Sequence, residues 1–245
     1  MVEVRDLRKQ FGGVTALAGV SFKAPDGQIT GLLGENGAGK TTTLNILSGL
    51  YHADRGSVTI DGAAASLEER RQRVGALLDH KGLYGRLTAR ENVEYFGALR
   101  GLTGAELKRR VQQALAAVGL DAIAERRAEG FSQGERMKVA LARVMVHTPQ
   151  NVLLDEPTNG LDVPSARHFK TILHGMRDRG ACIVFSSHLL SDVSALCDDV
   201  VIVSRGRTVA QGEPRALCQQ AGCATLEEAF LKLTGREEAL TCLSI

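Results

Sequence analysis

A glycine-rich segment placed between an apolar run and a helical pattern constrains the fold most. Residues 34–41, GENGAGKT, match G-x-x-x-x-G-K-[ST] and follow the apolar run QITGLL at 28–33. Gly34, Gly37 and Gly39 let the backbone curl into a nest of N–H donors, and the helix that follows directs its positive dipole end at the same place. A strand, loop and helix in this order predict an α/β fold built around a phosphate site.

The polar residues of this segment have the chemistry to hold a nucleoside triphosphate and its cation. Lys40 is expected to meet the β- and γ-phosphates as a point charge, and the Thr41 hydroxyl to ligate Mg²⁺. Asn36 and Thr42 are assigned to the same nucleotide site. The alternative is a glycine-rich turn that matches by accident, which the strand and helix around it disfavour.

A second apolar run, NVLLD at 151–155, ends in two carboxylates, Asp155 and Glu156. Ligands of doubly wound folds bind at this end of the strands. Asp155 is suited to hold Mg²⁺ through water, and Glu156, with no second cation to neutralise it, is suited to polarise an attacking water. Alone, such a pair is more often a solvated turn. Together with the phosphate loop it predicts a nucleotide-hydrolysis site.

Short apolar runs alternate with longer helical patterns along the chain, which predicts a largely parallel sheet. The first sixty residues carry EVRDL, GVSFKA and SVTID between glycine turns, as a small antiparallel sheet would. Residues 82–150 contain three helical patterns and no convincing strand pattern. The parallel strands are expected at 28–33, 74–78, 151–155, 182–187 and 199–204. The expected divisions are a core of 1–82 and 151–220, an inserted helical subdomain of 83–150 and a C-terminal helical tail of 221–245.

Composition excludes several classes of protein. Hydrophobic residues make up 44% of the 245 and charged residues 24%, which is typical of a globular chain. A net charge of +2 is too small to indicate nucleic-acid binding, and the clusters 108–110 and 126–127 are interpreted as solvated helix faces. No apolar run of about 18 residues or signal peptide is visible, so a cytoplasmic protein is expected. The five cysteines lack metal-site spacing and are interpreted as reduced thiols.

A third motif, together with the phosphate loop and the Asp155–Glu156 pair, gives the chain a family resemblance. Residues 131–135, FSQGE, open a helical pattern and resemble the LSGGQ signature of ATP-binding cassette (ABC) ATPases, a class of P-loop NTPases. They differ from it at Phe131, Gln133 and Glu135. Ser132 and Gly134 are kept, and the resemblance implies that they contact the phosphate of a nucleotide held by a second protomer. A capping box, with Ser132 at the N-cap and Glu135 three residues on, is the compatible local interpretation.

Other segments follow in the order that the family has. Residues 156–162, EPTNGLD, resemble its D-loop segment after the catalytic Glu, and Ser186-Ser187-His188 follows the strand pattern CIVF. The resemblance makes Glu156 the catalytic base and His188 the γ-phosphate sensor, although a lone histidine at a strand end is normally structural. Phe11 aligns with the aromatic residue that stacks on adenine, and a core phenylalanine is the equal alternative.

One departure falls where the family has a Gln that touches Mg²⁺ and reports to the membrane subunit. Asp79 stands there, either as a metal ligand or as a solvated strand-end residue. The sequence also resembles ATPase subunits of ABC-2-type exporters, most of all the sodium-extrusion kind. The segments that carry this resemblance are GALLDHKGLYGRLTARENVEYF around Asp79, FSQGE and LEEAFLKLTG.

The resemblance implies that two copies sandwich two ATP molecules and drive a separate membrane permease, docked at the groove near Asp79, on the inner face of the membrane. ATP and Mg²⁺ are the implied cofactors, and sodium or a drug the implied cargo. A soluble ABC ATPase acting on nucleic acid or ribosomes is the second hypothesis. A nucleotide-gated binding module with negligible turnover is the third.

Overall fold

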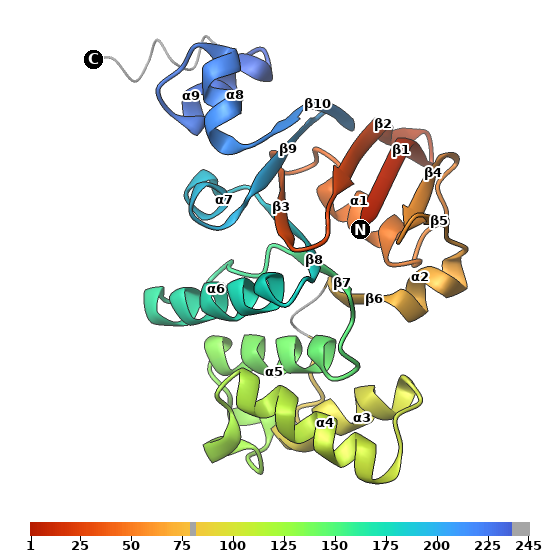
Figure 1. Cartoon of the computed structure of the whole chain (residues 1–245), viewed down its shortest axis with the longest axis vertical. Coiled ribbons are helices and arrows are strands. Elements are labelled where there is room, and N and C mark those ends of the chain that lie inside the picture. Colours follow the sequence, from red (N-terminus) through yellow and green to blue (C-terminus); the bar gives the residue numbers. More distant parts are fainter. Residues whose placement is uncertain (79–81, 237–245) are drawn as a thin grey trace.

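The computed structural model describes residues 1–78 and 82–236, and Figure 1 shows their arrangement. The strands of this part form one sheet in the order β5-β4-β1-β2-β10-β9-β3-β8-β7-β6. Their bounds are β1 Val2–Phe11, β2 Val14–Ala24, β3 Gln28–Leu33, β4 Arg55–Ile60, β5 Ala63–Ala64, β6 Val74–Leu77, β7 Asn151–Asp155, β8 Cys182–Ser187, β9 Asp199–Ser204 and β10 Arg207–Gly212.

The five strands at one end of the sheet, β9-β3-β8-β7-β6, are all paired in parallel. They are the five strands expected from the apolar runs, and the mostly parallel core is confirmed. Strand β10 was not expected. It pairs antiparallel with β9 and joins the rest of the sheet through one parallel pair, Arg207 with Gly19 of β2.

The other end of the sheet is antiparallel, as expected: β1 pairs with β2 and β4, and β4 pairs with β5. Strands β1 and β2 are longer than the runs EVRDL and GVSFKA, because residues 8–11 and 14–18, which are mostly exposed or half-buried, continue the ladder to the pair of Phe11 and Val14. This extension carries Phe11 to the last ladder pair before the β1–β2 turn.

Three α-helices lie between β6 and β7, where the sequence predicts them: α3 Ala89–Leu99, α4 Gly104–Ala117 and α5 Gln133–Met145. Figure 1 shows them grouped below the sheet, with α6 next to α5. The domain boundaries drawn at 83 and 150 stay a prediction. The other helices are α1 Lys40–Leu47, α2 Leu67–Arg73, α6 Val163–Asp178, α7 Leu190–Leu196, α8 Pro214–Ala221 and α9 Leu226–Leu233, with 3₁₀ turns at Asp121–Ile123 and Ala128–Gly130.

The parallel strands feed two hydrophobic cores because their side chains alternate between the two faces of the sheet. Leu154 of β7 and Phe185 of β8 face the core shared with α5 and α6. Leu153 and Val184, one residue earlier on the same strands, face the core shared with α1 and the antiparallel strands. Both faces of the central strands are thereby covered, and their polar ends are left at the edge where the site forms.

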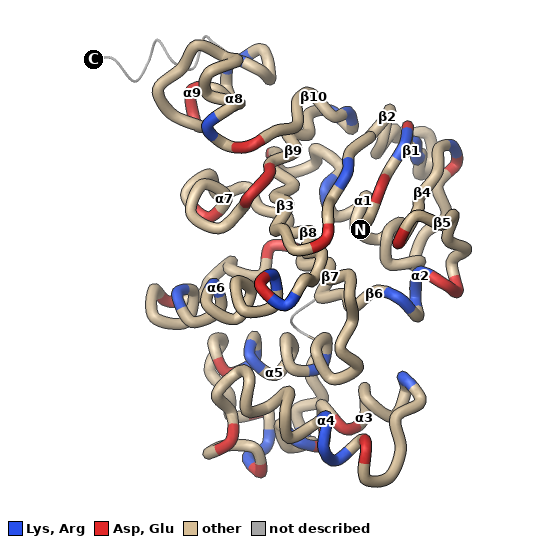
Figure 2. Tube along the Cα trace, in the orientation of Figure 1, with Lys and Arg blue, Asp and Glu red and all other residues tan. Residues whose placement is uncertain are grey.

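Positive and negative side chains are interspersed along the chain (Figure 2). On α4, Arg109 and Arg110 both form ion pairs with Glu106, at 2.6 and 2.7 Å, and Arg126 pairs with Glu135 at 3.1 Å. Residues 108–110 lie on α4, as expected, but Arg126 and Arg127 lie between the two 3₁₀ turns, so the interpretation of that cluster as a helix face is wrong. Within the described ranges, no helix has the length and apolar character needed to cross a membrane.

Candidate active site

The phosphate loop connects the end of β3 to the start of α1, and its shape requires glycine at two positions. A Cβ atom on Gly34 would lie 2.5 Å from the carbonyl oxygen of Val203. Gly39 is the N-cap of α1 with φ of 106°, and a Cβ there would lie 2.6 Å from Leu17 Cδ2. A side chain at either glycine would displace packed neighbours, so the loop geometry depends on both.

Lys40 is the first residue of α1 and is nearly buried, with 6% of its side chain exposed. Its Nζ donates hydrogen bonds to the backbone oxygens of Gly34 (2.7 Å) and Glu35 (3.2 Å). The same atom lies 3.3 Å from Glu156 Oε1. The ammonium group is thus held over the loop and against the second motif.

The two carboxylates follow β7 and are supported by the adjacent strand β8. Asp155 pairs with Ser186 in the parallel ladder, and the Ser186 hydroxyl donates to Asp155 Oδ1. The backbone N–H of Glu156 donates to the same hydroxyl oxygen at 3.0 Å and to the Ser186 carbonyl at 3.2 Å. Glu156 has φ of 46°, a conformation that non-glycine residues rarely adopt and that clusters at functional sites.

His188 is the third side chain of this group. Its Nδ1 lies 2.8 Å from Glu156 Oε2, while Lys40 approaches the other oxygen of the same carboxylate. The expectation that no second cation neutralises Glu156 is therefore wrong for this structure. Two chain segments that the sequence separates by more than a hundred residues supply the contacts to this carboxylate.

The residues expected to hold Mg²⁺ fit that ion by their chemistry. Asp155 presents a carboxylate with 7% exposure, and Thr41 is an exposed hydroxyl next to Lys40. Mg²⁺ prefers oxygen ligands and is commonly held by one or two protein groups together with substrate phosphates. Among the described residues, no group of three or more His, Cys, Asp or Glu could hold a metal by itself. Asp79 lies outside the described residues.

Ser132 is the N-cap of α5 and is exposed. Its hydroxyl accepts a hydrogen bond from the N–H of Glu135 at 3.2 Å, and the Glu135 carboxylate accepts one from the N–H of Ser132 at 2.8 Å, so the capping box is confirmed. A Cβ on Gly134 would lie 2.5 Å from Ser165 Oγ. Figure 1 shows α5 among the helices below the sheet and α1 beside the strands of the sheet. Ser132 and Lys40 thus lie at the N-termini of two separate helices of one chain.

Gln133, one of the departures from the family signature, makes a contact of its own. Its Nε2 donates to the backbone oxygen of Asn159 at 3.0 Å, and it packs against Gly160, where a Cβ would lie 2.4 Å from Nε2. This amide ties the start of α5 to the segment that follows Glu156. The sequence gives no signal for the contact, because the two residues approach only in the folded chain.

Phe11 lies at the end of β1 with 42% of its surface exposed. The core alternative for this residue is wrong. Its ring stands edge-on to Tyr51, with the centroids 5.4 Å apart and an angle of 67° between the planes. An exposed aromatic pair at this end of β1 is available for a planar ligand.

The phosphate loop also has a neighbour from the end of the chain. Arg236, just after α9, forms an ion pair with Glu35. Together with Asn36, Phe230 and Thr234, these two residues line a cavity of about 180 Å³ beside the loop. Asn36 and Gly37 are exposed here, as a loop that receives a ligand requires.

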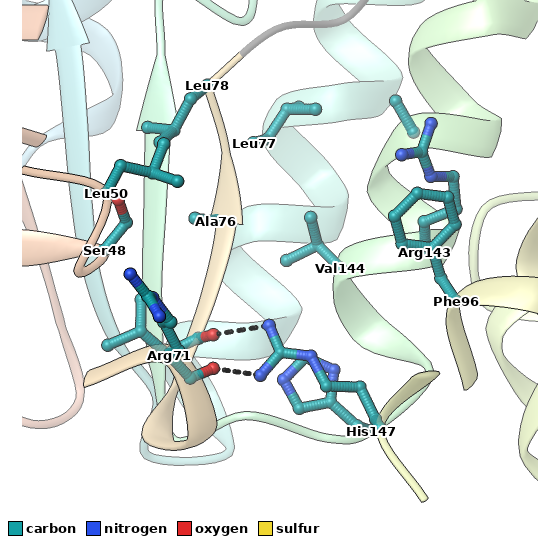
Figure 3. Close-up of a pocket in the computed structure, with 13 residues that line it drawn as sticks. Ser48, Leu50, Arg71, Ala76, Leu77, Leu78, Phe96, Arg143, Val144 and His147 are labelled. Atoms are coloured by element: carbon teal, nitrogen blue, oxygen red, sulfur yellow. Dashed lines mark hydrogen bonds between the residues drawn. The ribbon is translucent and has the colours of Figure 1, made fainter. Parts of the chain in front are cut away.

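A second cavity, of about 330 Å³, opens where β6 meets α3 and α5 (Figure 3). Arg100 donates to the backbone oxygens of Arg71 and, at 3.1 Å, Val74, and Arg143 lies 3.5 Å over the ring of Phe96. Burial, with the nearby charge of Arg100, lowers the pKa of His147 to about 4. The lining combines apolar residues with cations: Ser48, Leu50, Arg71, Val74, Ala76, Leu77, Leu78, Phe96, Arg100, Ala140, Arg143, Val144 and His147.

Comparisons with known proteins identify the class that this fold and site define. The ABC transporter family matches residues 17–159, and the chain belongs to this family. It is an ATP-binding subunit of an ABC transporter and an ATPase.

Two curated relatives come from Bacillus subtilis (strain 168). The ABC transporter ATP-binding protein NatA is 37% identical over 238 residues, which cover 94% of this chain and 97% of NatA. The linearmycin resistance ATP-binding protein LnrL is 34% identical over 241 residues, which cover 98% of this chain and 77% of LnrL. A solved ATP-binding subunit of an ABC transporter superposes with a TM-score of 0.86 at 30% identity, over 96% of this chain and 99% of that one.

Proposed function

We propose that this chain is the ATPase of an ABC-2-type exporter for an ion or a drug, which works as an ATP-sandwich dimer on a separate permease. The observation that carries the proposal is the convergence of Lys40, Glu156 and His188 at the ends of β3, β7 and β8. Export is supported by the similarity of this chain to a linearmycin resistance protein and by the exporter-like sequence of residues 75–96.

The roles of the site residues follow from their chemistry. Lys40 neutralises the β- and γ-phosphates, while the N–H groups of 34–42 surround them. Glu156 accepts a proton from the attacking water, and His188 donates a hydrogen bond to the γ-phosphate. Asp155 and Thr41 would hold Mg²⁺, which supplies positive charge for the leaving phosphate. Phe11 would stack on the adenine base.

The dimer follows from the separation of the two halves of the site. Ser132 is exposed and Gly134 is partly exposed at the start of α5, whereas the phosphate loop lies at the start of α1. A helix N-terminus attracts a phosphate, so a second copy can place its Ser132 and Gly134 against the nucleotide bound by the first. The two subunits would then approach each other when ATP binds and separate after hydrolysis.

The cavity in Figure 3 is the proposed docking site for the permease, which would hold the ATPase on the inner face of the membrane. Its apolar floor from β6 and α5 suits the apolar face of a short partner helix, and its arginines suit an acidic residue or a helix C-terminus. Replacing Ala76 by a larger residue in this cavity would hinder docking without touching the ATP site.

One experiment tests the function as a whole. The full chain is purified with its membrane partner, and phosphate release is measured with and without that partner reconstituted in vesicles. We expect turnover by the wild-type chain, almost none by Glu156→Gln, and partner-dependent stimulation that Ala76→Phe reduces. Wild-type turnover near zero would support a nucleotide-gated binding module instead. Co-purification of nucleic acid without a membrane protein would support the soluble alternative.

A further inference from the structure

The ring of Phe11 is held by two residues that belong to no sequence motif. Tyr51, which is itself 42% exposed, contacts it edge-on at a centroid distance of 5.4 Å. Lys9 Nζ lies over the ring, 5.3 Å from its centroid. One face of Phe11 is thus turned to a cation, while 42% of the residue remains exposed.

Lys9 does not sit there freely. Its Nζ is 2.8 Å from Asp54 Oδ1, and Asp54 Oδ2 accepts a hydrogen bond from the N–H of Gln10, also at 2.8 Å. These contacts with Lys9 and Gln10 hold the pKa of Asp54 below its ordinary value. Asp54 therefore stays charged at neutral pH and fixes the ammonium beside the ring.

Tyr51 is connected to the phosphate loop through α1. The backbone N–H groups of Leu50 and Tyr51 both donate to the carbonyl oxygen of Asn45, at 2.9 and 3.2 Å. Asn45 lies in the helix that begins at Lys40. The position of the Tyr51 ring is therefore set by the same helix that sets the position of Lys40.

We infer that Tyr51 and Lys9 are positioning residues for the nucleotide base, which hold the Phe11 ring as a preformed platform at a fixed place relative to the phosphate loop. This inference rests on the proposed role of Phe11 in stacking. Without Tyr51, the exposed Phe11 side chain gains rotamer freedom that ATP binding must then remove. Without the Lys9 cation, the electrostatic contact with the ring is lost.

The test compares ATP with inorganic tripolyphosphate, which carries the phosphates without a base. Titration calorimetry is performed on the full chain and on Phe11→Ala, Tyr51→Leu, Tyr51→Phe and Lys9→Met. Tyr95→Leu is the matched control, because Tyr95 is also an exposed tyrosine in an edge-on aromatic pair, on α3.

We expect Tyr51→Leu to weaken ATP binding by about three- to tenfold, the range that an aromatic pair provides. Lys9→Met should weaken it by about two- to fivefold. Binding of tripolyphosphate should change less than about twofold in both, Tyr51→Phe should keep the wild-type affinity for ATP, and Tyr95→Leu should change neither ligand.

Three results would overturn the inference. In the first, Phe11→Ala weakens ATP binding while Tyr51→Leu and Lys9→Met do not. In the second, both variants lose ATP and tripolyphosphate binding equally, which would indicate general damage to the fold. In the third, Phe11→Ala binds ATP as the wild type does, which removes the platform itself. Failure of the proposed function differs from all three, since the wild-type chain would then not turn over ATP.

Discussion

Lys40 Nζ lies 3.3 Å from Glu156 Oε1, so the cation expected to hold the phosphates is paired with the carboxylate expected to activate water. Both side chains are largely buried, at 6% and 21% exposure. A γ-phosphate that reaches Lys40 must compete with Glu156 for the ammonium group. Release of Glu156 from this pair then leaves its carboxylate oxygen free to accept a hydrogen bond from a water molecule next to the bound nucleotide.

Glu156→Gln is expected to bind ATP more tightly than the wild type, by about three- to tenfold, because the competing charge is removed. Hydrolysis should fall by about a hundredfold or more through loss of the base, and the variant should accumulate as a nucleotide-bound dimer. Calorimetry, phosphate release and light scattering measure the three effects. Glu213→Gln, an exposed site with the same change of charge, is the control. A variant that stays monomeric with ATP and turns over normally would exclude Glu156 as the base.

Lys40→Ala is expected to abolish ATP binding at millimolar nucleotide. The loop backbone would keep its N–H donors, but the cation that bonds Gly34 and Glu35 and faces the site would be gone. Lys170→Ala is the matched control, since it removes a lysine of α6 that is paired with Asp192 of α7. Fluorescent-nucleotide titration should separate the two variants clearly. Near-wild-type affinity in Lys40→Ala would contradict the assignment of the phosphate loop.

Sequence predicts best the strands whose residues form a recognisable local pattern. The strand runs 28–33, 151–155, 182–187 and 199–204 are continuous apolar segments, and the structure places the strands at those residues. Strand β10 was missed because its residues alternate between exposed and half-buried in RTVAQG, which is polar and short. Its position depends on pairing with β9, which no local pattern encodes.

The candidate site also contains residues that local motifs predict and contacts that only the fold creates. Gly34, Lys40 and Asp155 are found from motifs because phosphate binding demands those residue types at fixed spacing. The Lys40–Glu156 pair and the bridge from Ser186 were missed, since each joins two elements that are far apart in the sequence. The register of β7 and β8, which sets Asp155 opposite Ser186, is the signal that would have revealed the bridge.

Acid should destabilise this chain in part through His147. Burial and the charge of Arg100 lower its folded-state pKa to about 4, whereas in the unfolded chain it has the ordinary value of about 6.5. Between these values the unfolded state binds more protons, so this contribution to stability is present above pH 6.5 and is lost as the pH falls toward 4. From pH 7 to pH 5 the loss is about 1–2 kcal/mol, allowing for solvent at its exposed edge.

Urea unfolding at pH 7 and pH 5 measures this effect by comparison of variants. His147→Gln should lose less stability between the two pH values than the wild type does, because the glutamine does not titrate. His52→Gln, at an exposed position, should keep the wild-type difference. Equal losses in His147→Gln and the wild type would show that His147 is not the group that titrates.

Ser186→Ala tests whether the hydroxyl between the two carboxylates positions them for hydrolysis. The change leaves Asp155 Oδ1 without its donor and removes one of the two acceptors of the Glu156 N–H. Stability should fall by about 1–3 kcal/mol, the cost of a buried polar group that loses its partner. Because Glu156 is held at a positive φ, loss of this support should also lower kcat by about tenfold or more, while the Kd for ATP changes less than about threefold.

Ser187→Ala is the matched control, since that hydroxyl accepts from the N–H of Leu189 at 2.9 Å and makes no hydrogen bond to either carboxylate. Steady-state phosphate release and nucleotide titration, both at a temperature where each variant is folded, would separate the two serines. Equal kcat values for Ser186→Ala and Ser187→Ala would mean that the bridge stabilises the strand ends without positioning the base.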